Sequence, residues 1–262
     1  TENHSGEYFE PFEKIGATDM NGTTWLDRTN YFQTVPKTAL DMALWMESDR
    51  MGHLLGAIDQ AALDEQRGVV KNEKRQGENE PYGRVMEALQ RASFPEGHPY
   101  RWETIGSMED LSAATLDDVK DWFRTYYGAA NATLVLAGDI DVATAKAKVQ
   151  QYFGHIPSGP PVSRLESWVA PRSSSTREEM QDRVAQTRVH RVWNVAERST
   201  ADADYLEMAA RILGQGKTSR LYERLVYRDQ IADSVSAFPL VLELSSIFFI
   251  QADVKAGVDS AR

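Results

Sequence analysis

The sequence of 262 residues contains no cysteine. Disulfide bonds, thiol nucleophiles and thiolate metal sites are therefore excluded together. Because a chain without cysteine tolerates both oxidising and reducing surroundings, this absence leaves the compartment open. Histidine is scarce as well, and the chain has only these five: His4, His53, His98, His155 and His190.

The chain also lacks a long apolar run and a positive net charge. No apolar run approaches the roughly 20 residues that a membrane-spanning helix needs, so no membrane span is expected. The formal net charge of -10 argues against nucleic acid or an anionic membrane as a partner. A composition of 42% hydrophobic and 26% charged residues is ordinary for a globular protein, and the length allows two domains.

The most informative segment that is present is a predicted helix over residues 63–76. At helical spacing Leu63, Gln66, Val70 and Glu73 share one stripe, and such a stripe normally faces a core. A carboxylate in that position is costly unless it is paired, hydrogen-bonded or bound to a metal. The alternative is that Glu73 belongs to the charged run 71–75 and is solvated, as most charged residues are. Periodicity alone leaves both interpretations open.

Three segments follow one another in a characteristic order: residues 3–23, the helix with Arg67 and Glu73, and residues 122–141. Together they resemble the pitrilysin/insulinase family of zinc metallopeptidases, the inverzincins with an H-x-x-E-H motif. The first segment is similar to the stretch that follows the family's zinc-binding helix and ends in the edge strand that receives substrate. The third is similar to the family's helix, strand and Gly-Asp turn.

The resemblance implies roles for four residues of this chain. Glu73 matches the distal zinc ligand, and Gln66 stands where many relatives have a glutamate that supports the ligand shell. Asn21 and Gly22 fall in the edge strand and would bind substrate, although an ordinary turn role for Asn21 is equally open. None of the five histidines lies in H-x-x-E-H, so two histidine ligands and the glutamate base are expected upstream of Thr1. We therefore expect no catalytic residue in this chain, Zn²⁺ only in the full-length protein, and a fragment that is inactive by itself.

The function implied by the resemblance is that of a zinc-dependent endopeptidase that hydrolyses peptides or unfolded polypeptides. The zinc would lower the pKa of a bound water, and the upstream glutamate would take its proton. The expected partners are a peptide substrate and either a second half of the same protein or a partner subunit. Export to a bacterial periplasm is expected by the same analogy.

A non-catalytic family member, acting as a partner subunit or scaffold, is the alternative function. Gln66 favours it because an amide adds no charge to a ligand shell. The family's later halves often carry an arginine and a tyrosine that contact the substrate carbonyl, and Val226 and Asp233 occupy those positions here. The residues upstream of Thr1 would discriminate between the two functions.

The expected fold class is α+β, built from tandem metallopeptidase-type α/β units with a mixed or antiparallel sheet covered by helices. Residues 1–157 form the first unit, which lacks its N-terminal strands and zinc helix. Residues 158–176, rich in proline, glycine and serine, read as a linker, and residues 177–262 read as a second, C-terminally truncated unit. The predicted strands are 31–35, 133–137, 184–193, 234–241 and 247–254, and the predicted helices after residue 80 are 84–92, 116–128, 142–153, 201–213 and 219–228.

Three single residues carry smaller expectations. Gly68 lies inside a predicted helix, which suggests close approach of a neighbouring backbone or a tolerated cost of about 1 kcal/mol. His53 is expected to cap a helix or to be partly buried, and His98 is expected to lie in a loop between Pro95 and Pro99.

Overall fold

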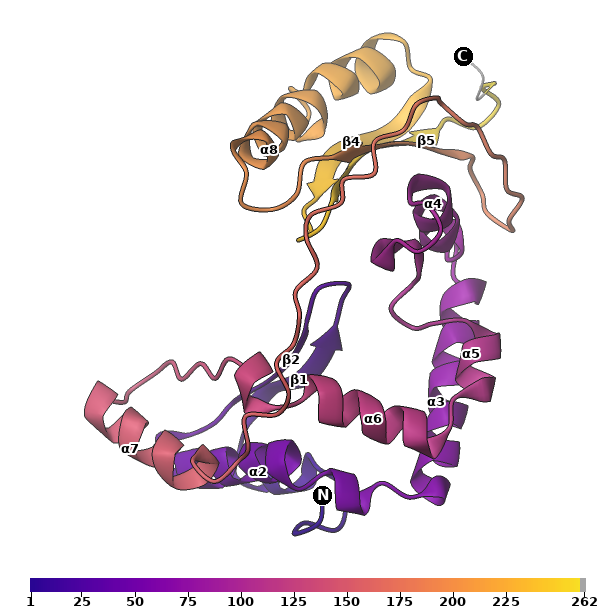
Figure 1. The fold of residues 1–262 in the computed structure, drawn as a ribbon. Coiled ribbons are helices and arrows are strands. Elements are labelled where there is room, and N and C mark those ends of the chain that lie inside the picture. The colour runs from indigo at the N-terminus through magenta and orange to yellow at the C-terminus, as the bar shows by residue number, and fades with distance from the viewer. Residues whose placement is uncertain (260–262) are drawn as a thin grey trace. The chain divides into compact units, whose positions relative to one another are not determined.

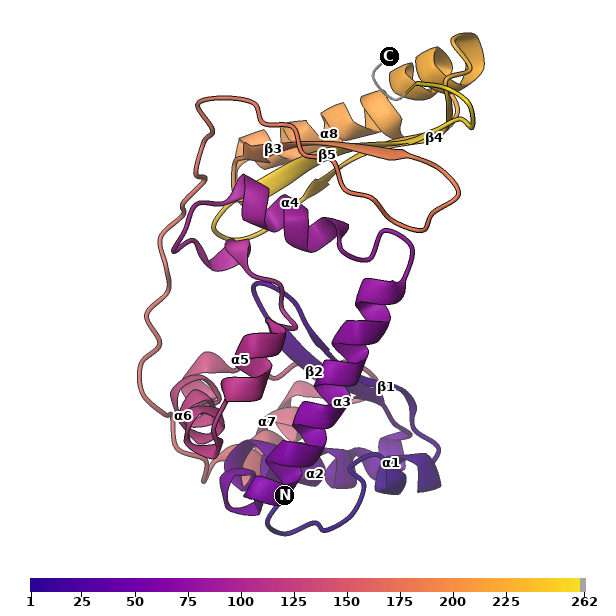
Figure 2. The same cartoon turned by 90° about the vertical axis from the view of Figure 1, so that its right-hand side faces the viewer.

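The computed structural model describes residues 1–259, and its helices and antiparallel sheets confirm the predicted α+β class (Figures 1 and 2). By its contacts the chain forms two compact units. Unit 1 comprises Thr1–Asn72 and Ser107–Arg164, and unit 2 comprises Glu73–Gly106 and the chain from Leu165 onward. Within the described residues no helix is both long and apolar enough to cross a bilayer.

This grouping by contacts differs from the predicted boundaries, because residues 73–106 pack with the later part of the chain. Residues 158–176 contain neither a helix nor a strand. The succession of two family units with boundaries at 157 and 177 stays a prediction, and its last three residues, 260–262, lie outside the described part of the chain.

Unit 1 is mainly helical. Its small core contains the fully buried Phe12 of α1 (Glu10–Lys14), packed with Ala43 and Met46 of α2 (Leu40–Gly52). Helix α7 (Val142–Phe153) lies against α2, where Lys148 Nζ and the hydroxyl of Tyr152 both donate to Asp41 Oδ1, at 2.5 and 3.1 Å. The other α-helices described in this unit are the first part of α3 (Gln60–Asn79), α5 (Met108–Ala113) and α6 (Leu116–Tyr126).

Two helices of unit 1 start at side chains that cap them. Thr115 caps α6 through a capping box, in which its hydroxyl accepts from the Asp118 N–H and the Asp118 carboxylate accepts from the Thr115 N–H. Asp141 caps α7 by accepting from the Thr144 N–H at 2.9 Å. The predicted bounds of α7 are the observed ones.

The sheet of unit 1 is a two-stranded antiparallel hairpin of β1 (Thr18–Thr24) and β2 (Thr29–Thr34). The register shifts by one residue between Thr18 and Asn21, which is a β-bulge, and Asp19 within it has a φ of 51°. Among the residues described, β1 and β2 pair only with each other, so each strand has one unpaired edge.

The strand predicted at residues 133–137 is not formed. The residues carry a strand-like sequence, but no described strand pairs with them, and Val135 is 76% exposed. A β-strand is stabilised by its neighbours much more than by its own propensity. The prediction was therefore wrong for a reason that composition does not reveal.

Unit 2 is built on a three-stranded antiparallel sheet in the order β3-β5-β4. The strands are β3 (Arg188–Val195), β4 (Ala232–Leu240) and β5 (Ser246–Val254), and each overlaps a predicted strand. Helix α8 (Ala201–Gly214) covers one face, where Ala210 packs on β4 and β5 (Figure 1). Helix α4 (Val85–Ser93) lies on the other face, where Asn194 of β3 donates to the Ser93 carbonyl at 3.0 Å (Figure 2). A π-helical segment, Tyr222–Arg228, connects α8 to β4.

His98 lies in the predicted loop but is fully buried, which the sequence did not indicate. Its Nδ1 accepts from the Tyr100 N–H at 3.0 Å, and its Nε2 donates to the Trp168 carbonyl at 2.9 Å. Its ring also stacks on Phe94, with 4.3 Å between the centroids. Burial lowers the pKa of His98 below its ordinary value, against the opposing effect of the bond to Trp168. The neutral ring is thus a structural part of unit 2.

Candidate functional site

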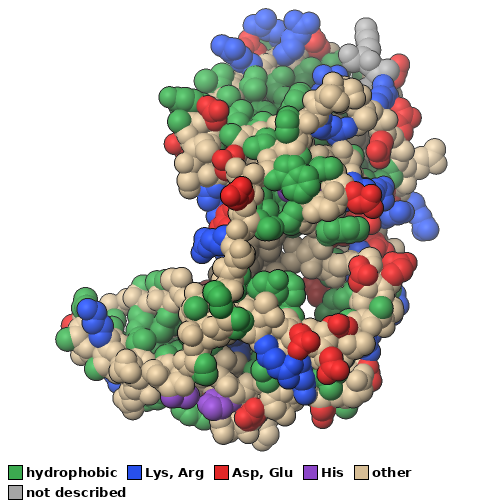
Figure 3. Space-filling view, in the orientation of Figure 1, with side chains coloured by type: hydrophobic (Ala, Val, Ile, Leu, Met, Phe, Trp, Pro, Cys, Tyr) green, Lys and Arg blue, Asp and Glu red, His purple; other side chains and the backbone are tan. Residues whose placement is uncertain are grey.

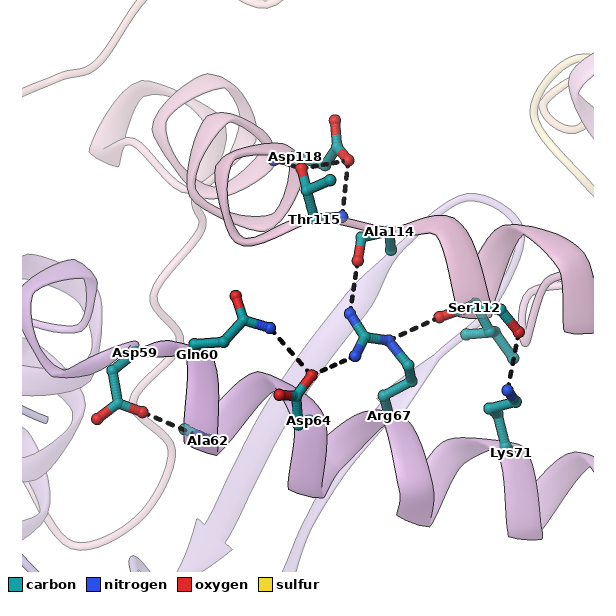
Figure 4. Close-up of polar contacts among 11 residues, drawn as sticks. Asp59, Gln60, Ala62, Asp64, Arg67, Lys71, Ser112, Ala114, Thr115 and Asp118 are labelled. Atoms are coloured by element: carbon teal, nitrogen blue, oxygen red, sulfur yellow. Dashed lines mark hydrogen bonds and ion pairs between the residues drawn. The ribbon is translucent and has the colours of Figure 1, made fainter.

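The predicted site residues Gln66 and Glu73 both lie on α3; Gln66 belongs to the first part of this helix, which Arg67 fixes within unit 1, and Glu73 belongs to unit 2. The guanidinium of Arg67 donates to the carbonyls of Leu111 and Ala114, at 3.0 and 2.6 Å, and pairs with Asp64 (Figure 4). One helical turn further on, Lys71 donates to Ser112 Oγ at 2.8 Å. These contacts hold the first part of α3 against α5 and the residues that follow it.

The buried charge of this helix is Lys74 and not Glu73. The Lys74 side chain is 6% exposed, and its ammonium lies 3.3 Å from carboxylate oxygens of Glu78 and Glu103. Burial opposes the charged form, but the two carboxylates outweigh it, so the pKa of Lys74 is raised. The sequence missed this residue, although its long aliphatic stem is what allows a lysine to occupy a buried helix position.

Both predicted polar members of the stripe are exposed. Leu63 and Val70 are half-buried as expected, whereas Gln66 and Glu73 face solvent. The solvated interpretation of Glu73 therefore describes this structure, and its exposed carboxylate is accessible to a ligand. Gly68 lies on the same helix, and a Cβ there would meet no described atom within 4 Å. Among the described residues no backbone approaches Gly68 closely, so the glycine is a residue whose helix-destabilising cost of about 1 kcal/mol is tolerated.

The predicted substrate-binding residues Asn21 and Gly22 are exposed on β1 and belong to unit 1. Asn21 pairs with Phe32 and Gly22 with Tyr31 across the hairpin. The Asn21 carboxamide oxygen accepts from the Gly22 N–H at 2.8 Å, so this side chain organises its own strand. One edge of β1 pairs with β2, and the other edge offers unpaired backbone groups among the described residues.

The residues present do not by themselves fit a hydrolytic zinc site. Within residues 1–259 no three histidine, cysteine, aspartate or glutamate side chains are grouped so that they could hold a metal ion. Glu73 supplies one carboxylate, whereas zinc in a hydrolytic site takes about three protein ligands and a water. No step through a metal can be assigned to the residues of this chain.

Comparison with known proteins shows to which family the chain is similar. The family model "Peptidase M16 inactive domain" matches residues 113–261, which is more than half of the chain. The zinc protease PqqE of Helicobacter pylori is 26% identical over 258 residues, which are 95% of this chain and 56% of that protein. The chain thus spans about half the length of this curated relative.

Two solved structures share the fold. The peptidase M16 inactive domain from Pseudomonas fluorescens superposes with a TM-score of 0.83 at 18% identity, over 95% of this chain and 60% of that one. The first half of the periplasmic protease PqqL from Escherichia coli superposes with a TM-score of 0.68 at 18% identity, over 94% of this chain and 55% of that one. The sequence resemblance is confirmed, and the chain belongs to the M16 family of peptidases, the pitrilysin/insulinase family.

Proposed function

We propose that this chain is part of a longer zinc-dependent endopeptidase that hydrolyses peptides or unfolded polypeptides. The observation that carries the proposal is the family match, because PqqE, which is similar to this chain over 95% of its length, is named a zinc protease. Within the longer enzyme Glu73 would be one zinc ligand, and Gln66, seven residues earlier on α3, would support the ligand shell. The exposed carboxylate on a helix anchored by Arg67 supports this role.

The function is tested by assaying the longer protein that contains this chain for hydrolysis of a denatured, fluorescently labelled polypeptide. We expect EDTA to abolish hydrolysis and added Zn²⁺ to restore it, because the bound ion supplies the activated water. Hydrolysis that EDTA leaves unchanged would contradict a zinc peptidase.

A partner subunit or scaffold is the second candidate function. It is favoured by the name of the matched family model, an inactive domain, and by Val226 and Asp233 in place of the family's arginine and tyrosine. The residues encoded immediately before Thr1 distinguish the two candidates. An intact H-x-x-E-H supports the peptidase, and other residues there support the subunit.

We also propose that the longer protein is exported from a bacterial cell. The fold likeness to PqqL, which is named a periplasmic protease, supports this location. An N-terminal secretory signal peptide in the encoded sequence is expected, and its absence would count against export.

Substrate would bind as an added strand along the unpaired edge of β1, next to Asn21 and Gly22. An exposed strand edge presents unpaired N–H and C=O groups, and an extended peptide can satisfy them through backbone hydrogen bonds. Such binding depends little on substrate side chains, which suits an enzyme that accepts unfolded polypeptides.

The edge-binding mode is tested with substrate peptides methylated at single backbone nitrogens. Since a strand turns alternate N–H groups to opposite sides, methylation at every second residue should raise KM about tenfold, through a lost hydrogen bond of about 1 kcal/mol and a steric clash. The intervening positions serve as matched controls and should have little effect. Equal effects at all positions would show that the peptide does not pair with the edge.

A further inference from the structure

Two histidines of unit 1 meet at the ends of neighbouring helices. His53 is the residue after α2, and its N–H donates to the Asp49 carbonyl at 2.8 Å. His155 follows Gly154, which ends α7, and α2 and α7 pack on each other. The Nε2 atoms of the two rings are 3.4 Å apart. Histidine side chains lie together at the surface in this region (Figure 3).

The geometry of the pair suits a bridging metal ion. The ring planes are 20° apart and the centroids are 5.6 Å apart, so the two Nε2 atoms, at 3.4 Å, approach each other more closely than the ring centres do. A tetrahedral zinc ion with Zn–N bonds of about 2.0–2.1 Å holds its ligand nitrogens about 3.3–3.4 Å from each other. The observed separation matches that of two zinc-bound imidazoles, and on binding the nearly parallel rings would turn so that both lone pairs meet at one ion.

The surroundings favour a cation. Both helices point their C-terminal ends at the pair, and these ends carry partial negative charge. Glu2 Oε2 lies 3.8 Å from His53 Nδ1, on the side of the ring away from His155. A carboxylate in that position orients a ligating histidine.

A buried carboxylate lines the same cavity. The cavity measures about 240 Å³ and is bounded by both histidines together with Asp49 and Tyr152, among others. Asp49 is 3% exposed, its Oδ1 accepts from Asn3 Nδ2 at 2.6 Å, and its Oδ2 has no hydrogen-bond partner within the described residues. An unpartnered carboxylate oxygen is costly in a buried position, and a cation with bound water in this cavity would relieve the cost.

We propose that His53 and His155 form a second site for a borderline divalent transition-metal ion, with Zn²⁺ as the reference ion, on unit 1. The two imidazoles supply the protein ligands, and water completes the coordination. The site shares no residue with α3, so it is independent of Glu73 and of the proposed peptidase function. Two ligands and open positions predict weaker binding than a closed structural site of four ligands.

The test is a calorimetric titration of the 262-residue chain with Zn²⁺. We expect one ion per chain, and an affinity at least about tenfold lower in His53→Gln and in His155→Gln, since even an orienting partner of a ligand contributes 10–100-fold. His4→Gln is the matched control, because His4 belongs to the same unit, its Nε2 lies 3.4 Å from the Glu7 carbonyl, and it is not among the residues that line the cavity. Glu73→Gln should also leave this binding unchanged, which separates this site from the proposed catalytic one.

Two results would overturn the proposal. One is a wild-type chain that takes up no Zn²⁺, and the other is a His53→Gln/His155→Gln chain that binds it with unchanged affinity. Circular dichroism of each variant verifies folding, and both substitutions keep a polar side chain at a partly exposed position. In the wild type, Zn²⁺ should also raise Tm, because an ion that binds only the folded state stabilises it, and the double variant should lose this rise.

Discussion

Replacing Glu73 by glutamine in the longer protein that contains this chain should lower both bound zinc and kcat/KM, by about 100-fold or more. The amide keeps the size of the side chain but removes the negative charge with which a carboxylate holds Zn²⁺. Loss of a partner that only orients a ligand already costs 10–100-fold, so loss of a ligand should cost at least as much. Zinc content by atomic absorption and initial rates on a denatured polypeptide measure the two effects.

Glu65→Gln is the control for this substitution. Glu65 is exposed on the same helix, α3. Its replacement by glutamine removes the same charge without altering the proposed zinc ligand. Its variant should retain zinc and activity. Unchanged zinc and activity in Glu73→Gln would mean that Glu73 is a solvated surface residue, as its exposure in this chain allows.

The second large effect is expected from Gly214→Ala at the end of α8. A Cβ at Gly214 would lie 2.1 Å from the backbone nitrogen of Ala237 and 2.7 Å from its Cβ. These atoms belong to β4, which is held by its ladder to β5 and cannot move aside freely. Overpacking of this kind costs about 1–3 kcal/mol, so Tm should fall by several degrees, since each kcal/mol shifts Tm by about 2–4 °C in a chain of this size.

Gly68→Ala provides the matched comparison for thermal unfolding followed by circular dichroism. The same methyl group at Gly68 meets no described atom within 4 Å, and the position is a helix interior. Alanine there should stabilise the chain by about 0.5–1 kcal/mol. If both variants unfolded at the same temperature, the close approach of α8 to β4 would be refuted.

Local signals in the sequence predicted most of the helices and strands. The predicted helix starts at 116 and 142 are the observed ones, and in the structure the side-chain oxygens of Thr115 and Asp141 cap these helices. The segment 133–137 failed because strand formation is decided by a partner outside the segment. Its β-rich sequence is therefore compatible with the exposed, unpaired conformation that Val135 shows.

The candidate site was predicted less well, because helical periodicity determines only approximately which side of a helix is buried. Leu63 and Val70 fit a stripe through Gln66 and Glu73, but they fit a stripe through Arg67 and Lys74 equally. The structure buries the second stripe, since Arg67 finds carbonyls and Lys74 finds two carboxylates. Glu78 lies only four residues after Lys74, but Glu103 and the carbonyls of Leu111 and Ala114 are distant in the sequence, so the pattern of α3 alone could not reveal them.

The unpaired edges of the β1–β2 hairpin restrict which residue types this segment can contain without promoting aggregation. An edge that accepts any extended backbone also accepts a second copy of the same hairpin, which is how edge strands start aggregation. The exposed residues of β1 are threonine, aspartate, asparagine and glycine, none of which offers a large apolar side chain to a neighbouring copy. Selection for aqueous stability therefore keeps β1 polar independently of any selection for substrate choice, and a polar β1 is by itself no sign of specificity.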